Sequence, residues 1–228
     1  MKNLVKTGLP TIALAAAMFS GTAGAAPVTF SNWATNEGES GNYILTLEES
    51  TTAGFFDVEL TVDPWNAEAL GLFLDFGNST YGGPSNGGIT NVSTSPGTGG
   101  VTLYAVDTTS DACGPGCNLN GLNPSLDNPD GEWELVFRLA NQGFDGIQTF
   151  SWTMNAGGLQ LSDLVAAGAR AQQLCDAGTT LPDGSCNGSD KSFSSEPDAA
   201  SVPEPSSLAL LGLGLVGVGL GRRKLGRK

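Results

Sequence analysis

The chain has 228 residues, of which 23 are acidic, ten are basic and none is histidine, and its formal net charge is −13. The lack of histidine excludes Ser-His-Asp and Cys-His catalysis and every metal centre that needs an imidazole. The negative charge excludes nucleic acid as a partner, because an acidic protein repels the phosphate backbone.

The first 25 residues have the pattern of a signal peptide. Two lysines precede an apolar stretch over residues 9–19, and the segment ends in a small-x-small cleavage sequence. We expect signal peptidase to cut between Ala25 and Ala26, which removes residues 1–25. An uncleaved anchor is the disfavoured alternative, because the apolar stretch is shorter than the ~20 residues that span a bilayer.

The exported body is far more acidic than the whole chain. Residues 26–201 hold 22 acidic residues and three basic ones, Arg138, Arg170 and Lys191, which gives a net charge of −19. Such a charge favours solubility and attracts cations. We interpret it as a solvated outer face, with a dedicated cation site as the alternative.

The body shows the period-two alternation of β-strands. The clearest segments are 56–62, 72–76, 133–139 and 150–154, each predicted as a half-buried strand with one wet face. Weaker strands are expected at 28–33, 43–47, 89–93, 101–106 and 169–174. Residues 64–70 fit one helical turn, and residues 159–167 fit a short helix or an edge strand.

These elements predict an all-β protein with an antiparallel, jelly-roll-like β-sandwich. The sandwich is expected to be flanked by an N-terminal signal helix and a short C-terminal hydrophobic helix. The predicted domains are a signal peptide (1–25), an acidic β-sandwich (26–188), a flexible linker (189–201) and a C-terminal sorting or anchor segment (202–228).

The four cysteines are expected to form disulfides, because the protein is exported. Cys113 and Cys117 flank a Gly-Pro-Gly turn, and Cys175 and Cys186 flank a polar loop. Two local bridges are the simplest of the three possible connectivities. A four-thiolate zinc site is disfavoured, since the ten-residue gap in the second pair is too long for a zinc knuckle.

No cofactor is expected, and calcium (Ca2+) is the one candidate ion. Residues 127–132 gather oxygen donors in a turn, and calcium binds six to eight oxygens in flexible loops. The segment lacks the spacing of a calcium-binding EF-hand loop, so an ordinary turn is the favoured interpretation. Asp107 with Asp111 is a weaker candidate of the same kind.

We assign no catalytic residue and expect no enzyme activity. A pair of carboxylates could support glycoside hydrolysis, but many acidic residues approach one another by chance in so acidic a chain. Trp33, Trp65 and Tyr81 fall outside the regular strand pattern and are candidates for stacking on sugar rings, although ordinary packing is favoured. Trp133 and Trp152 are predicted to lie in the core.

The C-terminal end combines a polar motif, an apolar segment and a basic terminus. The motif consists of Val202, Pro203, Glu204 and Pro205, and the basic stop consists of Arg222, Arg223 and Lys224. The 16 residues between them are rich in glycine and would span about 24 Å as a helix, which is short of the ~30 Å membrane core. The basic end is expected on the cytoplasmic face.

This C-terminal pattern resembles the PEP-CTERM sorting signal of Gram-negative bacteria. The resemblance implies processing by an exosortase at or near residues 203–205, and association with the extracellular polysaccharide of a biofilm. A plain C-terminal anchor is the alternative. In the body, residues 71–76, 117–121, 146–152, 168–172 and 188–191 are similar to a domain that recurs in this group and has no assigned activity.

The sequence therefore predicts an exported protein with a structural or polysaccharide-associated sandwich. The alternatives are a calcium-dependent adhesive domain and a carboxylate-pair glycosidase. Its expected partners are signal peptidase, an exosortase, extracellular polysaccharide and, through the C-terminal segment, the membrane. We expect transient anchoring in the inner membrane, followed by transfer to the cell surface or matrix.

Overall fold

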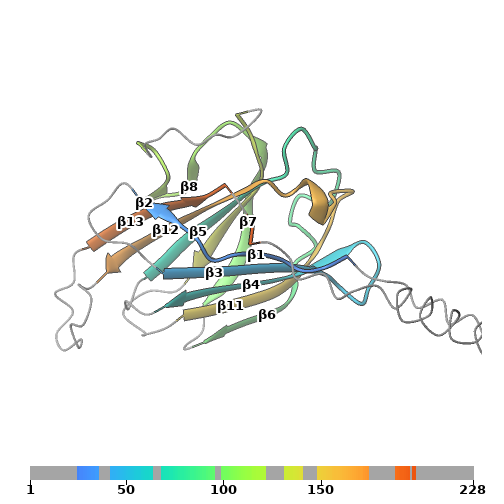
Figure 1. Ribbon diagram of the computed structural model, residues 1–228, viewed down its shortest axis with the longest axis horizontal. Coiled ribbons are helices and arrows are strands. Elements are labelled where there is room, and N and C mark those ends of the chain that lie inside the picture. Colours follow the sequence, from blue (N-terminus) through green and yellow to red (C-terminus); the bar gives the residue numbers. More distant parts are fainter. Residues whose placement is uncertain are drawn as a thin grey trace, which may run out of the picture.

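The computed structural model in Figure 1 describes residues 25–35, 42–63, 68–95, 99–121, 131–140, 148–174, 188–195 and 197–198. The predicted signal helix and C-terminal hydrophobic helix lie outside these residues. Ala25 and Ala26 are the first described residues, and they precede the first strand. Cleavage between them would therefore leave every described strand in the mature protein.

Two antiparallel sheets confirm the predicted all-β sandwich. Sheet A has the strand order β1 (Val28–Phe30), β3 (Asn42–Glu49), β4 (Phe55–Asp63), β11 (Gln148–Asn155), β6 (Thr90–Ser95). Sheet B has the order β2 (Ala34–Thr35), β13 (Gly188–Ser194), β12 (Ala166–Leu174), β5 (Glu68–Asp75), β10 (Trp133–Ala140), β7 (Gly100–Thr108). A separate small hairpin consists of β8 (Ala112–Gly114) and β9 (Cys117–Asn118).

The strands of the two sheets are interleaved in sequence, as in a jelly roll. Strands β4, β6 and β11 belong to sheet A, whereas β5, β7 and β10 belong to sheet B. Strand β11 lies between β4 and β6, and β10 lies between β5 and β7 in the same way. The chain thus winds around a shared core, with one face of each sheet directed inward.

The core between the sheets comes from the alternation that the sequence shows. In β11, Phe150, Trp152 and Met154 are buried, and the residues between them are partly exposed. The ring of Trp152 lies 5.1 Å from the ring of Phe137 on β10, measured between centroids. Each large apolar side chain buried in this way contributes about 1.5 to 3 kcal/mol. Trp152 is therefore a core residue, as predicted.

A second apolar cluster covers the outer face of sheet B, where the sequence predicts a wet face. Its members are Leu70, Phe73, Cys113, Cys117, Leu119, Trp133 and Val136. Every residue of β5 is buried as a result. The prediction of one wet face is wrong for β5 and β10, because the β8–β9 hairpin packs over them. Trp133 is buried as predicted, but it belongs to this outer cluster.

Strand β13 corrects the predicted domain boundary. The sequence predicts a flexible linker over 189–201, but β13 pairs with β12 and β2 in sheet B. Asp190 is buried and accepts hydrogen bonds from the hydroxyls of Tyr43, at 2.7 Å, and Thr35, at 2.5 Å. Because Tyr43 belongs to β3 of sheet A, this carboxylate joins the two sheets. The sandwich continues through Ser194, and the linker prediction is wrong for 189–194.

Two shorter predictions also need correction. Strand β5 begins at Glu68, inside the segment predicted as one helical turn; residues 64–67 lie outside the described part. Residues 159–167 contain a single turn of 3-10 helix, η1 (Leu161–Asp163), and the start of β12, which is an interior strand and not an edge. The leucines at 159, 161 and 164 pack into the inner core, which accounts for the apolar spacing.

Candidate functional site

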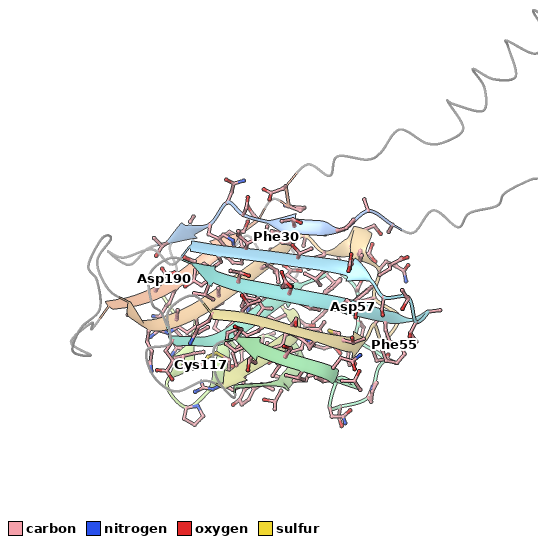
Figure 2. The ribbon with its side chains drawn as sticks, turned by 90° about the horizontal axis from the view of Figure 1, so that it is seen from below. Phe30, Phe55, Asp57, Cys117 and Asp190 are labelled. Atoms are coloured by element: carbon pink, nitrogen blue, oxygen red, sulfur yellow. A yellow bond between two sulfur atoms is a disulfide. The ribbon has the colours of Figure 1, made fainter. Side chains whose placement is uncertain are left out.

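The outer face of sheet A carries a polar trough. A cavity of ≈ 330 Å³ lies over strands β3, β4, β6 and β11. In Figure 2 sheet A lies in front, and Asp57 of the trough is labelled on β4. The described residues that line the trough are Thr46, Glu48, Asp57, Val58, Glu59, Asn91, Ser151, Trp152 and Thr153.

Strand register brings the polar residues of the trough together. Glu48 pairs with Asp57, and Asp57 pairs with Thr153 on the next strand. The neighbouring row consists of Thr46, Glu59 and Ser151. Directly opposed residues point to the same face, with Cβ atoms about 4.5 to 5.5 Å apart. The trough floor is thus two parallel rows of hydroxyl and carboxylate groups.

A short chain of hydrogen bonds orients one of these carboxylates. The hydroxyl of Thr153 donates to Oδ1 of Asp57 at 2.6 Å, and Nδ2 of Asn91 donates to the same hydroxyl at 3.2 Å. Asn91 has a φ of 52°, a left-handed conformation that asparagine tolerates better than most residues. These two hydrogen bonds connect β6 to β4 through β11 and hold the carboxylate of Asp57 in place.

The trough has the chemistry of a site for hydroxyl-rich ligands. Glu48, Asp57 and Glu59 supply carboxylates, and none of the described lining residues is basic. Carboxylates accept hydrogen bonds from hydroxyls, while the threonine and serine hydroxyls both donate and accept. The same carboxylates repel anions. A neutral sugar is therefore suited to this surface, and an anionic one is not.

Two of the three aromatic candidates for sugar stacking, Tyr81 and Trp33, are described, and both pack within the protein. Tyr81 is only 6% exposed, its N–H donates to Oδ1 of Asp107 at 2.9 Å, and its hydroxyl donates to the carbonyl of Asn155 at 3.3 Å. Burial raises the pKa of Tyr81 above its ordinary value. Trp33 packs 5.3 Å from the ring of Tyr43, and Trp65 lies outside the described residues. Tyr81 anchors a loop, which agrees with the favoured interpretation of ordinary packing, and its buried ring is not available for stacking on a sugar.

Calcium binding stays a prediction without a located site. In the part of the chain that the structure describes, no group of three or more Cys, Asp or Glu side chains is arranged to hold a metal ion. Of the predicted turn, only Gly131 and Glu132 are described. Asp111 accepts a hydrogen bond from Nε1 of Trp133 at 3.1 Å, and Asp107 binds the backbone of Tyr81.

Two kinds of carboxylate pair are present, and they differ in access. Asp75 and Glu134 lie one residue beyond the paired Leu74 and Leu135, and both carboxyls are completely buried. Glu134 accepts a hydrogen bond from the backbone N–H of Phe76. A polysaccharide cannot reach this pair. Across the trough, in contrast, Glu48 and Asp57 face solvent.

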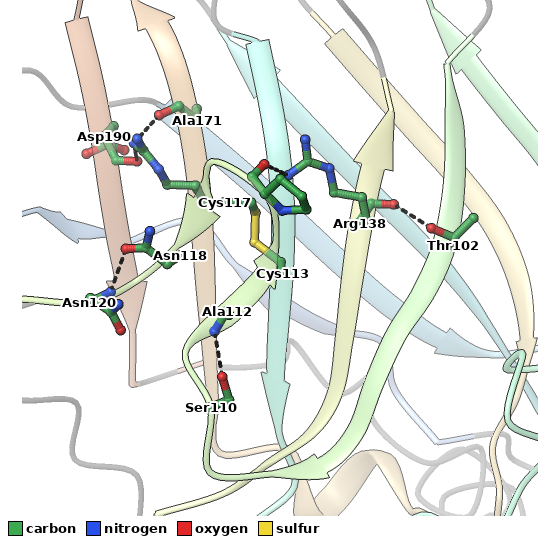
Figure 3. The surroundings of a disulfide bond; sticks show 12 residues. Thr102, Ser110, Ala112, Cys113, Cys117, Asn118, Asn120, Arg138, Ala171 and Asp190 are labelled. Carbon is green, nitrogen blue, oxygen red and sulfur yellow. Dashed lines mark hydrogen bonds between the residues drawn. A yellow bond between two sulfur atoms is a disulfide. The ribbon is translucent and has the colours of Figure 1, made fainter.

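Cys113 and Cys117 form a disulfide within the β8–β9 hairpin, next to its turn, as Figure 3 shows. Both sulfurs pack on β5 at Gly71, where a Cβ atom would lie only 2.4 Å and 2.7 Å from them. Only a residue without a side chain fits there. The second cysteine pair, Cys175 and Cys186, lies outside the described residues, so its bridge stays a prediction.

The three basic residues of the body lie in one row across sheet B. Arg138 and Arg170 both pair with Gly71, from the two sides of β5, and Arg170 pairs with Lys191. Lys191 donates to the carbonyl of Asn120 at 2.7 Å, and Arg138 donates to that of Pro115 at 3.4 Å. Sequence reasoning missed this row, because only strand register shows that the residues are neighbours.

The predicted sorting motif and basic stop lie outside the described residues. Within the described part, no helix has the length and hydropathy needed to cross a membrane. Neither the curated proteins nor the solved structures contain a match to this chain. Residues 201–224, in contrast, match the family described as the PEP-CTERM protein-sorting motif. The chain therefore carries a PEP-CTERM protein-sorting motif, the signal of an exported protein that is processed at the membrane by an exosortase and reaches the cell surface.

Proposed function

We propose that this protein is a non-enzymatic component of the cell surface or extracellular matrix that binds polysaccharide through the trough on sheet A. The trough is the observation on which the proposal rests. It combines a ≈ 330 Å³ hollow with ordered hydroxyls and carboxylates on four strands of a rigid sheet. Sites built on strands hold their polar groups more exactly in place than sites on loops.

The sorting signal supports the same proposal from another direction. Exosortase processing delivers the sandwich to the surface, where polysaccharide is the abundant hydroxyl-rich polymer. Transient anchoring by the C-terminal segment would keep the protein at the inner membrane until it is processed. We further propose that binding needs neither calcium nor a chemical step.

The test compares two neighbouring glutamates of β3. Glu48 lines the trough, whereas Glu49 is the next residue along the strand and points away from it. The mature protein, purified from its producing cells, is titrated against neutral polysaccharide from the same cells. We expect Glu48→Gln combined with Asp57→Asn to weaken binding about tenfold or more, because charge-assisted hydrogen bonds are lost.

Glu49→Gln serves as the matched control and should leave binding unchanged. Equal affinity of the trough variant and the control would refute the trough as the binding site. A loss of binding on calcium removal would point to the adhesive alternative, and release of reducing sugar ends would point to a glycosidase.

A further inference from the structure

Tyr104 is the most exposed large hydrophobic side chain in the described part of the sandwich. It lies on β7, an edge strand of sheet B, and half of its surface is accessible. Phe137 of β10 pairs with Leu103, and the adjacent Val136 pairs with Ala105. Tyr104 is therefore the extra residue of a β-bulge. Such bulges commonly redirect a side chain at a sheet edge or beside a functional site.

The bulge places Tyr104 beside Arg138 and the disulfide hairpin. A Cβ atom on Gly114 would lie 3.5 Å from Cε2 of Tyr104 and 3.9 Å from Cδ and Nη1 of Arg138. Both side chains thus approach one point at the hairpin tip, close enough for one monosaccharide to touch both. The disulfide and Gly71 fix the hairpin against sheet B, so this surface is rigid.

Most of the guanidinium N–H donors of Arg138 make no hydrogen bond to a described residue. Its one side-chain hydrogen bond with a described residue is the 3.4 Å contact to the Pro115 carbonyl, which engages one of the five guanidinium N–H groups. Arg138 is also the end of the basic row that continues to Arg170 and Lys191. In an otherwise acidic body, these charges make this part of sheet B the favourable place for an anion.

We propose that Tyr104 and Arg138 bind a sugar residue that carries a carboxylate. The apolar face of the sugar ring stacks on the exposed phenol ring, and the planar guanidinium holds the carboxylate through paired N–H donors. The class of ligand is an acidic, uronate-containing polysaccharide. The trough on sheet A lacks both a described basic residue and an exposed aromatic ring, so the two surfaces select different sugars.

This inference rests on the proposed function only in taking polysaccharide as the partner. The two surfaces lie on the outer faces of opposite sheets and do not share a described residue. A protein with both sites could hold two polysaccharide chains at once. Each site can be mutated without changing the other, so evidence against one binding site does not count against the other.

The experiment uses two probes with the same sugar backbone, an oligogalacturonate and its methyl ester, in which esterification removes the charge of each carboxylate. Mature protein from the producing cells is titrated with each by calorimetry. We expect the acid form to bind at least about tenfold more tightly than the ester. Arg138→Gln should abolish this preference, and Arg138→Lys should weaken it, because lysine keeps the charge but loses the planar fork. Tyr104→Ser should weaken the binding of both the acid and the ester, because both present the same apolar ring face to the phenol ring.

Two variants serve as controls. Tyr104→Phe keeps the ring and should bind as the wild type does, and the trough variant, Glu48→Gln combined with Asp57→Asn, should keep the preference for the acid form. Because Arg138 also contacts the hairpin, the unfolding midpoint of each variant is measured; the exposed Tyr104 supplies a variant that does not disturb the fold. Equal binding of acid and ester by the wild type, or a Tyr104→Ser variant that binds both probes as tightly as the wild type does, would overturn the proposal.

Discussion

Gly71 leaves the space that the Cys113–Cys117 disulfide occupies, because glycine has no side chain. The two sulfurs of the disulfide occupy the space that a Cβ atom on Gly71 would need. We expect Gly71→Ala to lower the free energy of unfolding by about 1 to 3 kcal/mol, the usual cost of overpacking a filled core. Urea unfolding of the mature protein measures this change.

Gly100 provides the matched control. It is also a strand glycine, at the start of β7, but nothing lies within 4 Å of the position of its Cβ atom. Gly100→Ala should therefore leave the protein unchanged or stabilise it by up to about 1 kcal/mol, since alanine has less backbone freedom to lose. Similar losses in both variants would show that Gly71 has no special relation to the disulfide.

Tyr81 predicts a specific dependence of stability on pH. Burial raises its pKa in the folded protein above the ordinary value of 10.0. The contribution of the Tyr81 hydroxyl to the free energy of unfolding is fully present below pH 10. It is lost as the pH rises from there through the pKa of the folded protein, because the hydroxyl loses its proton in the unfolded chain first. The difference in unfolding free energy between the wild type and Tyr81→Phe should thus become less favourable to the wild type across this range. A difference that stays constant with pH would contradict the burial of this hydroxyl.

The β8–β9 hairpin packs on the outer face of sheet B, over β5 and β10, and its disulfide restrains the hairpin in this position. Replacing both cysteines by alanine (Cys113→Ala with Cys117→Ala) removes a crosslink between residues four positions apart. Loop-closure entropy for so short a loop predicts a loss of about 2 kcal/mol. Urea unfolding, followed by tryptophan fluorescence, measures it. An unchanged unfolding curve would show that the position of the hairpin does not depend on the disulfide.

The same hairpin explains which elements the sequence could predict. Alternation alone identified the faces of β4 and β11, because each has one buried side and one polar side. It failed at Phe73 and Val136, because their outer face is covered by a hairpin that arrives from elsewhere in the chain. It failed at Asp190 for a related reason: a polar strand looks like a linker until Tyr43 and Thr35 supply its hydrogen bonds.

At the scale of the whole molecule, the three basic side chains of the body gather on one sheet. Composition predicts the net charge of the body but not its placement. Strand register gathers Arg138, Arg170 and Lys191 on sheet B, while Glu48, Asp57 and Glu59 gather over sheet A. Sequence reasoning identified neither the trough nor the Tyr104 surface, although alternation with Val101 and Leu103 was a signal that Tyr104 points outward. A protein with such faces can interact differently with neutral and acidic polymers.

We expect the C-terminal segment to determine whether this sandwich leaves the membrane. Its short, glycine-rich apolar stretch would form a marginal span, which suits a temporary anchor. We expect intact-mass analysis of the protein released from its producing cells to give a chain that starts at Ala26 and ends near Pro205, or carries an adduct there. In cells that lack the exosortase, the tail should remain complete and the protein should stay with the membrane.

A full-length tail in both strains would contradict processing, and residues 202–228 would then serve as a permanent anchor. The described sandwich, which continues through β13 to Ser194, leaves only a few residues before Val202. A permanently anchored sandwich would therefore stay close to the membrane surface. Release by the exosortase is what would allow the trough and the Tyr104 surface to reach polysaccharide far from the membrane.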